Sequence, residues 1–279
     1  MQAFSEFRDM SPEFWALVKF VSQELGYTNR ITKSVRTFSE QEIKGVLDYF
    51  DLVADARMIR NVSDYSIARA DVINTHIQRM LMDAQDVQEI FHDLMDVRYR
   101  YGLKCDIPMN KQSGDKKQPA YFTAIVNILA ERTIREVAGV TDCIGFDDNP
   151  LSLSCIIDEN RHIVGASSRR FDGAYPDVFN PKIVWEIKEY YYSKSFGSRV
   201  ADGVYETQLD GFEFKDLYDR TQHHVHHVFF VDGYTNWWEK GKSYLCRIVD
   251  ILNAGFVDEV IVGREVVSRW PEVLSDYIV

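Results

Sequence analysis

Apolar positions recur at helical spacing through most of the first hundred residues. A proline follows the N-cap candidate Ser11, and a capping box begins at Ser39, so both positions mark helix starts. The same spacing of apolar residues continues through 63–101 and predicts two or more further helices. A polar loop bounded by prolines follows at 106–119, and its three lysines are candidates for contacting phosphate. We therefore expect a helical lobe over residues 1–119, which either contacts DNA or forms a dimer.

The second half of the chain alternates helical periodicity with short apolar runs. Strands that are joined by helices form a mixed sheet that is covered on both faces. We therefore expect a second domain over residues 120–279, of the α/β class. Its expected helices are 121–137, 199–218 and 242–254, and its expected strands are 152–157, 162–166, 183–190, 225–231 and 257–262.

Composition excludes several classes of protein. The chain has 279 residues, of which 46% are hydrophobic and 27% are charged, as in ordinary globular proteins. No apolar run is long enough for a membrane span, and the N-terminus lacks the pattern of a secretory signal. The four cysteines are scattered, which is typical of reduced thiols, so we expect a cytoplasmic protein.

The net charge of −11 counts against binding of nucleic acid by overall attraction. Local charge is different, because the window 167–200 contains six basic and four acidic residues. A cleft can carry a positive potential within an acidic protein. The charge pattern therefore leaves a local site for a polyanion open.

The expected strand 183–190 contains charged residues, Glu186 and Lys188 among them, within an apolar run. Glu186 and Lys188 are two residues apart, so their side chains point to the same face of the sheet. Burial of charge is costly unless the charge is paired or binds a metal. Asn180-Pro181 is a turn signal, and a hairpin folded there would bring Asp177 beside Glu186. Two carboxylates and an ammonium on one face suit a divalent cation and an activated water molecule.

These residues carry a resemblance to a known family. Pro176-Asp177, followed by Glu186-Ile187-Lys188, resembles the motif of the PD-(D/E)XK superfamily, which includes many type II restriction endonucleases. The order of helices and strands over residues 120–265 is similar to the core of that superfamily. The resemblance implies a restriction-endonuclease-like fold, in which a mixed central sheet is flanked by helices.

The same resemblance implies a function and a set of site residues. Mg²⁺, with Mn²⁺ able to replace it, would be held by Asp177, Glu186 and the backbone carbonyl of Ile187. Lys188 would act on the attacking water or on the developing charge. The expected activity is hydrolysis of phosphodiester bonds in double-stranded DNA, site-specific and restriction-like, by a homodimer that faces a palindromic site.

Other assignments remain open at this point. Asp172 is a rival for the first carboxylate, although the glycine after it favours a turn. Glu131 and Gln208 lie on the expected helices, where related nucleases add a glutamate or a glutamine. The rival functions are a non-catalytic DNA-binding or assembly protein, in which the charged residues form an ion-pair network, and a defence or repair nuclease of the same superfamily.

Overall fold

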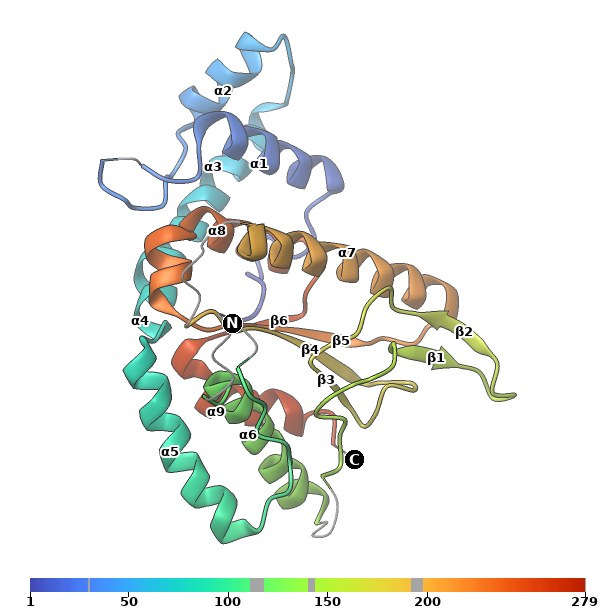
Figure 1. Cartoon of the computed structure of the whole chain (residues 1–279). Coiled ribbons are helices and arrows are strands. Elements are labelled where there is room, and N and C mark those ends of the chain that lie inside the picture. Colours follow the sequence, from blue (N-terminus) through green and yellow to red (C-terminus); the bar gives the residue numbers. More distant parts are fainter. Residues whose placement is uncertain (30, 111–117, 140–143, 192–197, 279) are drawn as a thin grey trace.

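A computed structural model describes residues 1–29, 31–110, 118–139, 144–191 and 198–278, and it has the expected mixed α/β architecture (Figure 1). Most of the lysine-containing loop 106–119 therefore lies outside the described residues. The helices are α1 (Pro12–Leu25), α2 (Glu40–Tyr49), α3 (Ala56–Asp71), η1 (Val72–Ile77), α4 (Gln78–Met80), α5 (Ala84–Tyr101), α6 (Tyr121–Ala138), α7 (Ser198–Thr221), η2 (Thr235–Lys240), α8 (Lys242–Asn253), η3 (Gly263–Glu265) and α9 (Val266–Ser275). The strands are β1 (Cys155–Ile157), β2 (Ile163–Ala166), β3 (Gly173–Tyr175), β4 (Ile183–Lys188), β5 (His226–Val231) and β6 (Glu259–Val262). In the described part of the chain, no helix has the length and apolar character needed to span a membrane.

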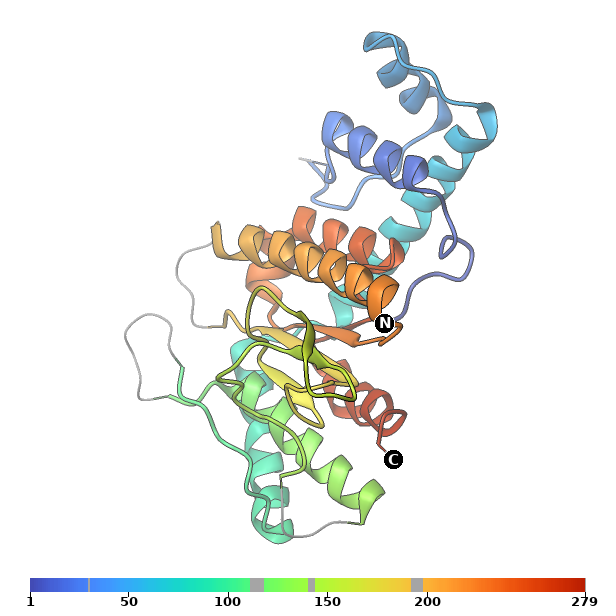
Figure 2. The ribbon, with the colours of Figure 1, turned by 90° about the vertical axis from the view of Figure 1, so that its right-hand side faces the viewer.

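The central sheet has the strand order β3-β4-β5-β6. Strand β3 is antiparallel to β4, whereas β4, β5 and β6 are parallel to one another. Parallel neighbours need a crossover connection, and α7 and α8 supply the two crossovers. Figures 1 and 2 show α7 and α8 over one face of the sheet and α6 and α9 over the other. The sequence-based expectation of a mixed sheet with helices on both faces is therefore confirmed.

Alternating side chains of β4 and β5 build two separate cores. Trp185 points to the α6 and α9 side, where its ring lies 5.1 Å from the ring of Trp270. Phe229 points to the α7 and α8 side and packs with Leu245. Each fully buried large apolar side chain contributes about 1.5–3 kcal/mol to stability. Because both faces are covered, the charged Glu186 is buried as well.

Strands β1 and β2 do not join the central sheet. They form a separate two-stranded antiparallel sheet, so two of the strands expected from the sequence lie outside the mixed sheet. Cys155 instead pairs with the loop after β3, accepting from Asn180 N and donating to Val178 O, each at 2.8 Å. The position beside β3 is taken by a single antiparallel bridge between Asp147 and Ala174. Among the described residues, the pairing on this edge of β3 is thus limited to one residue pair.

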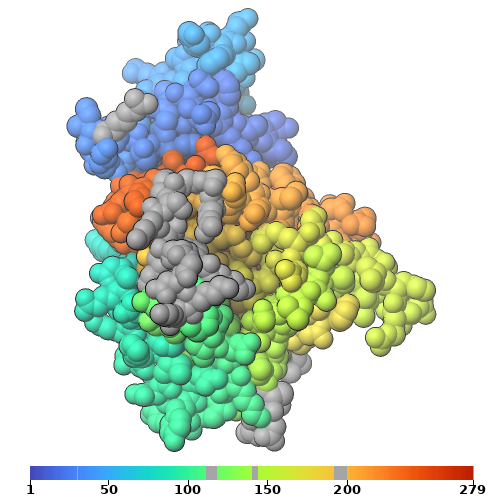
Figure 3. Space-filling model, in the orientation of Figure 1, coloured from blue at the N-terminus to red at the C-terminus, as the bar shows by residue number. Residues whose placement is uncertain are grey.

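The first three helices form a lobe with an aromatic core, which includes Phe14 and Tyr65. Figure 3 shows this lobe in blue beside the orange α8. A buried ion pair joins them, because Arg69 Nη1 of α3 lies 3.0 Å from both carboxylate oxygens of Asp250 in α8. Tyr65 donates a further hydrogen bond of 2.7 Å to Asp250. Helix α5, by contrast, packs against α6 in the core under the sheet, although the sequence analysis placed it in the lobe.

Candidate active site

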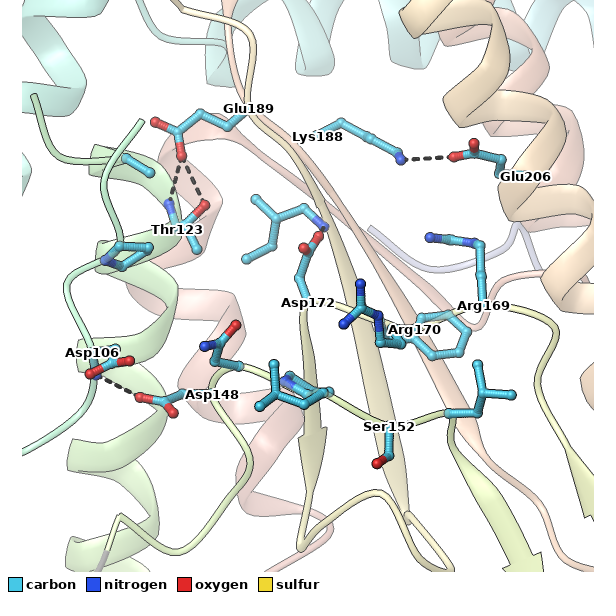
Figure 4. A pocket seen from close by; sticks show the side chains of 18 of the residues that line it. Asp106, Thr123, Asp148, Ser152, Arg169, Arg170, Asp172, Lys188, Glu189 and Glu206 are labelled. Atoms are coloured by element: carbon cyan, nitrogen blue, oxygen red, sulfur yellow. Dashed lines mark hydrogen bonds and ion pairs between the residues drawn. The ribbon is translucent and has the colours of Figure 1, made fainter. Parts of the chain in front are cut away.

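A cleft of about 1570 Å³ opens at the carboxyl end of β4 (Figure 4). Its walls come from residues near 106–110 and 148–153, from the loop before β3, and from α7. Open α/β sheets commonly bind ligands in such a crevice, outside the carboxyl ends of their strands. The charged residues nearest the strand end are Arg169, Arg170, Asp172, Lys188, Glu189 and Glu206.

The structure does not bring Asp177 to this cleft. The β3–β4 register pairs Gly173 with Trp185 and Tyr175 with Ile183, so the residue opposite Glu186 is Asp172. Asp177 lies in the turn beyond the other end of β3, where it is exposed and accepts a hydrogen bond of 2.5 Å from Phe179 N. The expectation that Asp177 lies beside Glu186 is therefore wrong, because the loop between the strands is longer than a tight hairpin turn.

Asp172 occupies the place that was expected for Asp177. Its Oδ2 accepts a hydrogen bond of 2.7 Å from Ile187 N, on the strand that carries Glu186. Burial and the nearby Glu186 raise the pKa of Asp172 to about 7. Because the N–H and C=O of one strand residue point to the same side of the strand, the carbonyl of Ile187 also faces the β3 side. Asp172, Glu186 and Ile187 therefore offer oxygen atoms to one region.

Glu186 is buried between two cations. Lys188 Nζ donates to its Oε1, and Arg169 Nη1 donates to its Oε2 at 2.9 Å. Burial opposes ionisation of Glu186, but the positive charges of Lys188 and Arg169 outweigh burial and lower its pKa. Burial likewise disfavours the charged form of Lys188, and Glu186 reverses this effect and raises the pKa of Lys188. The expectation that Glu186 and Lys188 stand together is confirmed.

Helix α7 contributes residues that the sequence analysis missed. Arg169 bonds to Asp210 of α7 through Nε at 2.9 Å and through Nη2 at 2.5 Å. Burial raises the pKa of Asp210 to about 6, although Arg169 opposes the shift. Glu206, four residues earlier on the helix, lies 3.2 Å from Lys188 Nζ. The sequence signal for this network was the helical spacing of Glu206 and Asp210, which follow Arg169 and Arg170 in the chain.

A glycine of α7 makes room for Lys188. A Cβ on Gly203 would lie 2.9 Å from Lys188 Cε, so a larger residue would displace the lysine side chain. Glycine is a poor helix former, so Gly203 is unfavourable for the helix itself. Here the close approach of Lys188 to the helix accounts for the glycine.

Glu131 and Gln208, the candidates on the expected helices, do not line the cleft. Glu131 is buried on α6, where it accepts hydrogen bonds from the backbone N–H groups of Lys104 and Cys105 and pairs with Arg135. Gln208 is half-buried on α7, but the lining residues of that helix are Asp202 and Glu206. The structure therefore does not bring either candidate to Asp172 and Glu186.

The donor atoms at the site fit a hard divalent cation. Carboxylate and carbonyl oxygens are the ligands that Mg²⁺ prefers. The pKa of Asp172 is raised partly by repulsion from Glu186, and a cation between the two carboxylates would relieve that repulsion. Within the described ranges, however, no three His, Cys, Asp or Glu side chains converge as a preformed metal site. In this structure Lys188 and Arg169 supply the positive charge around Glu186.

Fold and site together define an α/β protein with a charged cleft at the carboxyl end of a central strand. A family model described as a domain of unknown function (DUF7687) matches residues 82–277, which is more than two thirds of the chain. The chain therefore belongs to this family. A second model, also described as a domain of unknown function (DUF7690), matches residues 1–76. Searches of the curated proteins and of the solved structures found no match.

The two family matches bear on how the chain is divided. The DUF7690 match covers α1 to α3 and most of η1, and the DUF7687 match begins just before α5. This division agrees with the packing of α5 against α6. The sequence-based division at residue 119 stays a prediction about independent folding units.

Proposed function

We propose that this protein is a metal-dependent endonuclease that hydrolyses phosphodiester bonds in DNA, with a core of the PD-(D/E)XK type. The observation that carries the proposal is the meeting of Asp172, Glu186 and Lys188 at the end of β4, where Asp172 and Lys188 line the cleft and Glu186 is buried in contact with Lys188. Two carboxylates and a lysine on neighbouring strands are the set that the resemblance requires. The carboxylate nearer the N-terminus is Asp172 rather than Asp177.

Each residue has a role in the proposed reaction. Asp172, Glu186 and the carbonyl of Ile187 would hold Mg²⁺ or Mn²⁺. The bound ion would lower the pKa of a water molecule and offset charge on the scissile phosphate. Lys188 donates hydrogen bonds, and its ammonium would stabilise the negative charge that develops on the phosphate. Arg169 fixes Glu186 through its own bonds to Asp210.

The charge of the cleft favours metal dependence. Among its described lining residues there are six carboxylates and three cationic side chains. Such a surface repels a polyanion unless cations neutralise part of the acidic charge. A nuclease with this lining should therefore require divalent ions for binding as well as for chemistry. The restriction-like form of the proposal adds a duplex substrate and a two-fold dimer.

A non-catalytic DNA-binding or assembly protein is the second candidate. The observation in its favour is that Glu186 already has two cationic partners, Lys188 and Arg169. A buried network of this kind can serve structure alone. Cleavage measurements distinguish the two functions.

The test uses supercoiled plasmid, incubated with protein and Mg²⁺ or Mn²⁺, and again with EDTA. We expect cutting that depends on the metal and is lost in Asp172→Asn and Glu186→Gln. Asp177→Asn is the matched control, because it makes the same chemical change outside the cleft, and it should cut like the wild type. Discrete fragments indicate site-specific cleavage, whereas a smear indicates unspecific cleavage. Intact plasmid with both metals would reject the nuclease and favour the second candidate.

A further inference from the structure

Among the described residues, three cationic side chains line the cleft, and two of them have partners. Arg169 is bonded to Asp210 and Glu186, and Lys188 is bonded to Glu186 and Glu206. Arg170 is exposed, and within the described part of the chain it has no hydrogen bond or ion pair. Figure 4 shows its side chain in the cleft beside Asp172. Arg170 is therefore available to a ligand in a way that its neighbours are not.

The free-energy cost of binding an anion differs between Arg169 and Arg170. If Arg169 turned towards a ligand, the buried Asp210 would lose its partner, and Glu186 would lose one of two. Leaving a buried carboxylate without a counter-charge is strongly unfavourable. Arg170 loses no bond when it binds an anion. Its planar guanidinium also matches two oxygens of one phosphate group.

We propose that Arg170 binds a backbone phosphate of the nucleic-acid strand that lies in the cleft, next to the position of the scissile bond. This inference rests on the proposed function. This contact would not depend on the base sequence, because a phosphate contact positions the strand but does not distinguish one base from another. Arg170 also supplies a positive charge where, among the described lining residues, carboxylates outnumber cationic side chains.

The test measures binding of two fluorescent duplexes of unrelated sequence by anisotropy, over a range of salt concentrations. Ca²⁺ replaces Mg²⁺, and a gel checks that the duplexes stay intact. The variants are Arg170→Gln, which removes the charge, and Arg170→Lys, which keeps it. Arg161→Gln is the matched control, because Arg161 is also exposed but lies between β1 and β2, outside the cleft lining. Melting temperatures confirm that each variant is folded.

We expect Arg170→Gln to weaken binding about tenfold for both duplexes. The plot of log affinity against log salt should become shallower by about one unit. Arg170→Lys should keep the wild-type salt slope, and Arg161→Gln should match the wild type throughout.

Three results would contradict the inference. If the wild type binds and Arg170→Gln keeps its affinity and salt slope, the role of Arg170 is wrong while the proposed function stands. A loss for only one duplex would indicate contact with a base rather than with phosphate. If the wild type binds neither duplex and leaves plasmid intact, the inference and the proposed function fail together.

Discussion

Replacing Lys188 with methionine separates a catalytic role from a structural one. Methionine keeps much of the apolar stem that passes over Gly203, and it removes the ammonium that contacts Glu186 and Glu206. If Lys188 acts on the transition state, the variant should stay folded and cleave slowly. If Lys188 only balances Glu186, the main effect should be on stability.

The structure sets the expected size of each effect. Removing one partner of a buried ion pair typically costs about 3–5 kcal/mol. Here Arg169 remains bonded to Glu186 at 2.9 Å, so Glu186 keeps a counter-charge and we expect a loss of about 1–3 kcal/mol. Glu206 is 46% exposed, so its contact with Lys188 adds little. Loss of a donor to the transition state typically lowers the rate by about 10²–10³.

The assay combines single-turnover cleavage of plasmid in Mg²⁺ with urea unfolding. Lys215→Met is the control, since Lys215 is an exposed lysine of α7 that does not line the cleft. We expect Lys188→Met to lose about 10²–10³ in rate while it remains folded without urea. A variant that cleaves within a few-fold of the wild-type rate would refute the chemical role of Lys188. An unfolding loss above about 3 kcal/mol, in a protein whose wild type never cuts DNA, would instead identify a structural ion pair.

Three further predictions concern the surroundings of the site and the lobe. Gly203→Ala should displace Lys188 and lower the cleavage rate by up to about 10²-fold. In the control Gly45→Ala, the added Cβ meets no atom within 4 Å, so the rate should be unchanged. Arg69→Met should lower the free energy of unfolding by about 3–5 kcal/mol in urea melts. Adding Asp250→Leu should recover part of that loss. Equal losses in the single and double variants would show that the ion pair does not join lobe and core. Burial lowers the pKa of His227 from 6.5 to about 4, so the folded protein keeps this residue neutral while the unfolded chain binds a proton below pH 6.5. The stability from His227 is therefore complete above pH 6.5 and falls as the pH drops towards 4. Between pH 7.5 and 5 the wild type should lose about 2 kcal/mol more than His227→Phe, as measured by urea unfolding at both pH values, and parallel losses would contradict the assignment.

Local signals were sufficient for much of the core. Strands β4, β5 and β6 follow from apolar runs bounded by turns, because a strand buried on both faces has no alternation of polar residues. The pairing of Glu186 with Lys188 follows from the two-residue period of a strand. Helix α9 was missed because Pro271 lies inside it, and a proline in a helical pattern normally indicates an end.

The choice between Asp172 and Asp177 depended on tertiary structure. The sequence signal favoured Asp177, which follows a proline and lies closer to Glu186 along the chain. The register of β3 on β4 decided otherwise, and the hydrogen bond from Ile187 N to Asp172 forms only once that register exists. The acidic face of α7 indicates a cationic partner, but the partnership of Arg169 with Asp210 forms only once α7 packs over the sheet.

Asp172 is the residue that best distinguishes a nuclease from a structural network. Glu186 and Asp210 are already balanced by Lys188 and Arg169, so an ion-pair network would be complete without a third carboxylate. Asp172 has no direct ion pair among the described residues, and its raised pKa means that its ionised form is disfavoured there. Asparagine keeps an oxygen that accepts from the backbone and removes the repulsion with Glu186, so Asp172→Asn should be at least as stable as the wild type. Loss of cleavage in a variant of undiminished stability would therefore identify a residue kept for chemistry.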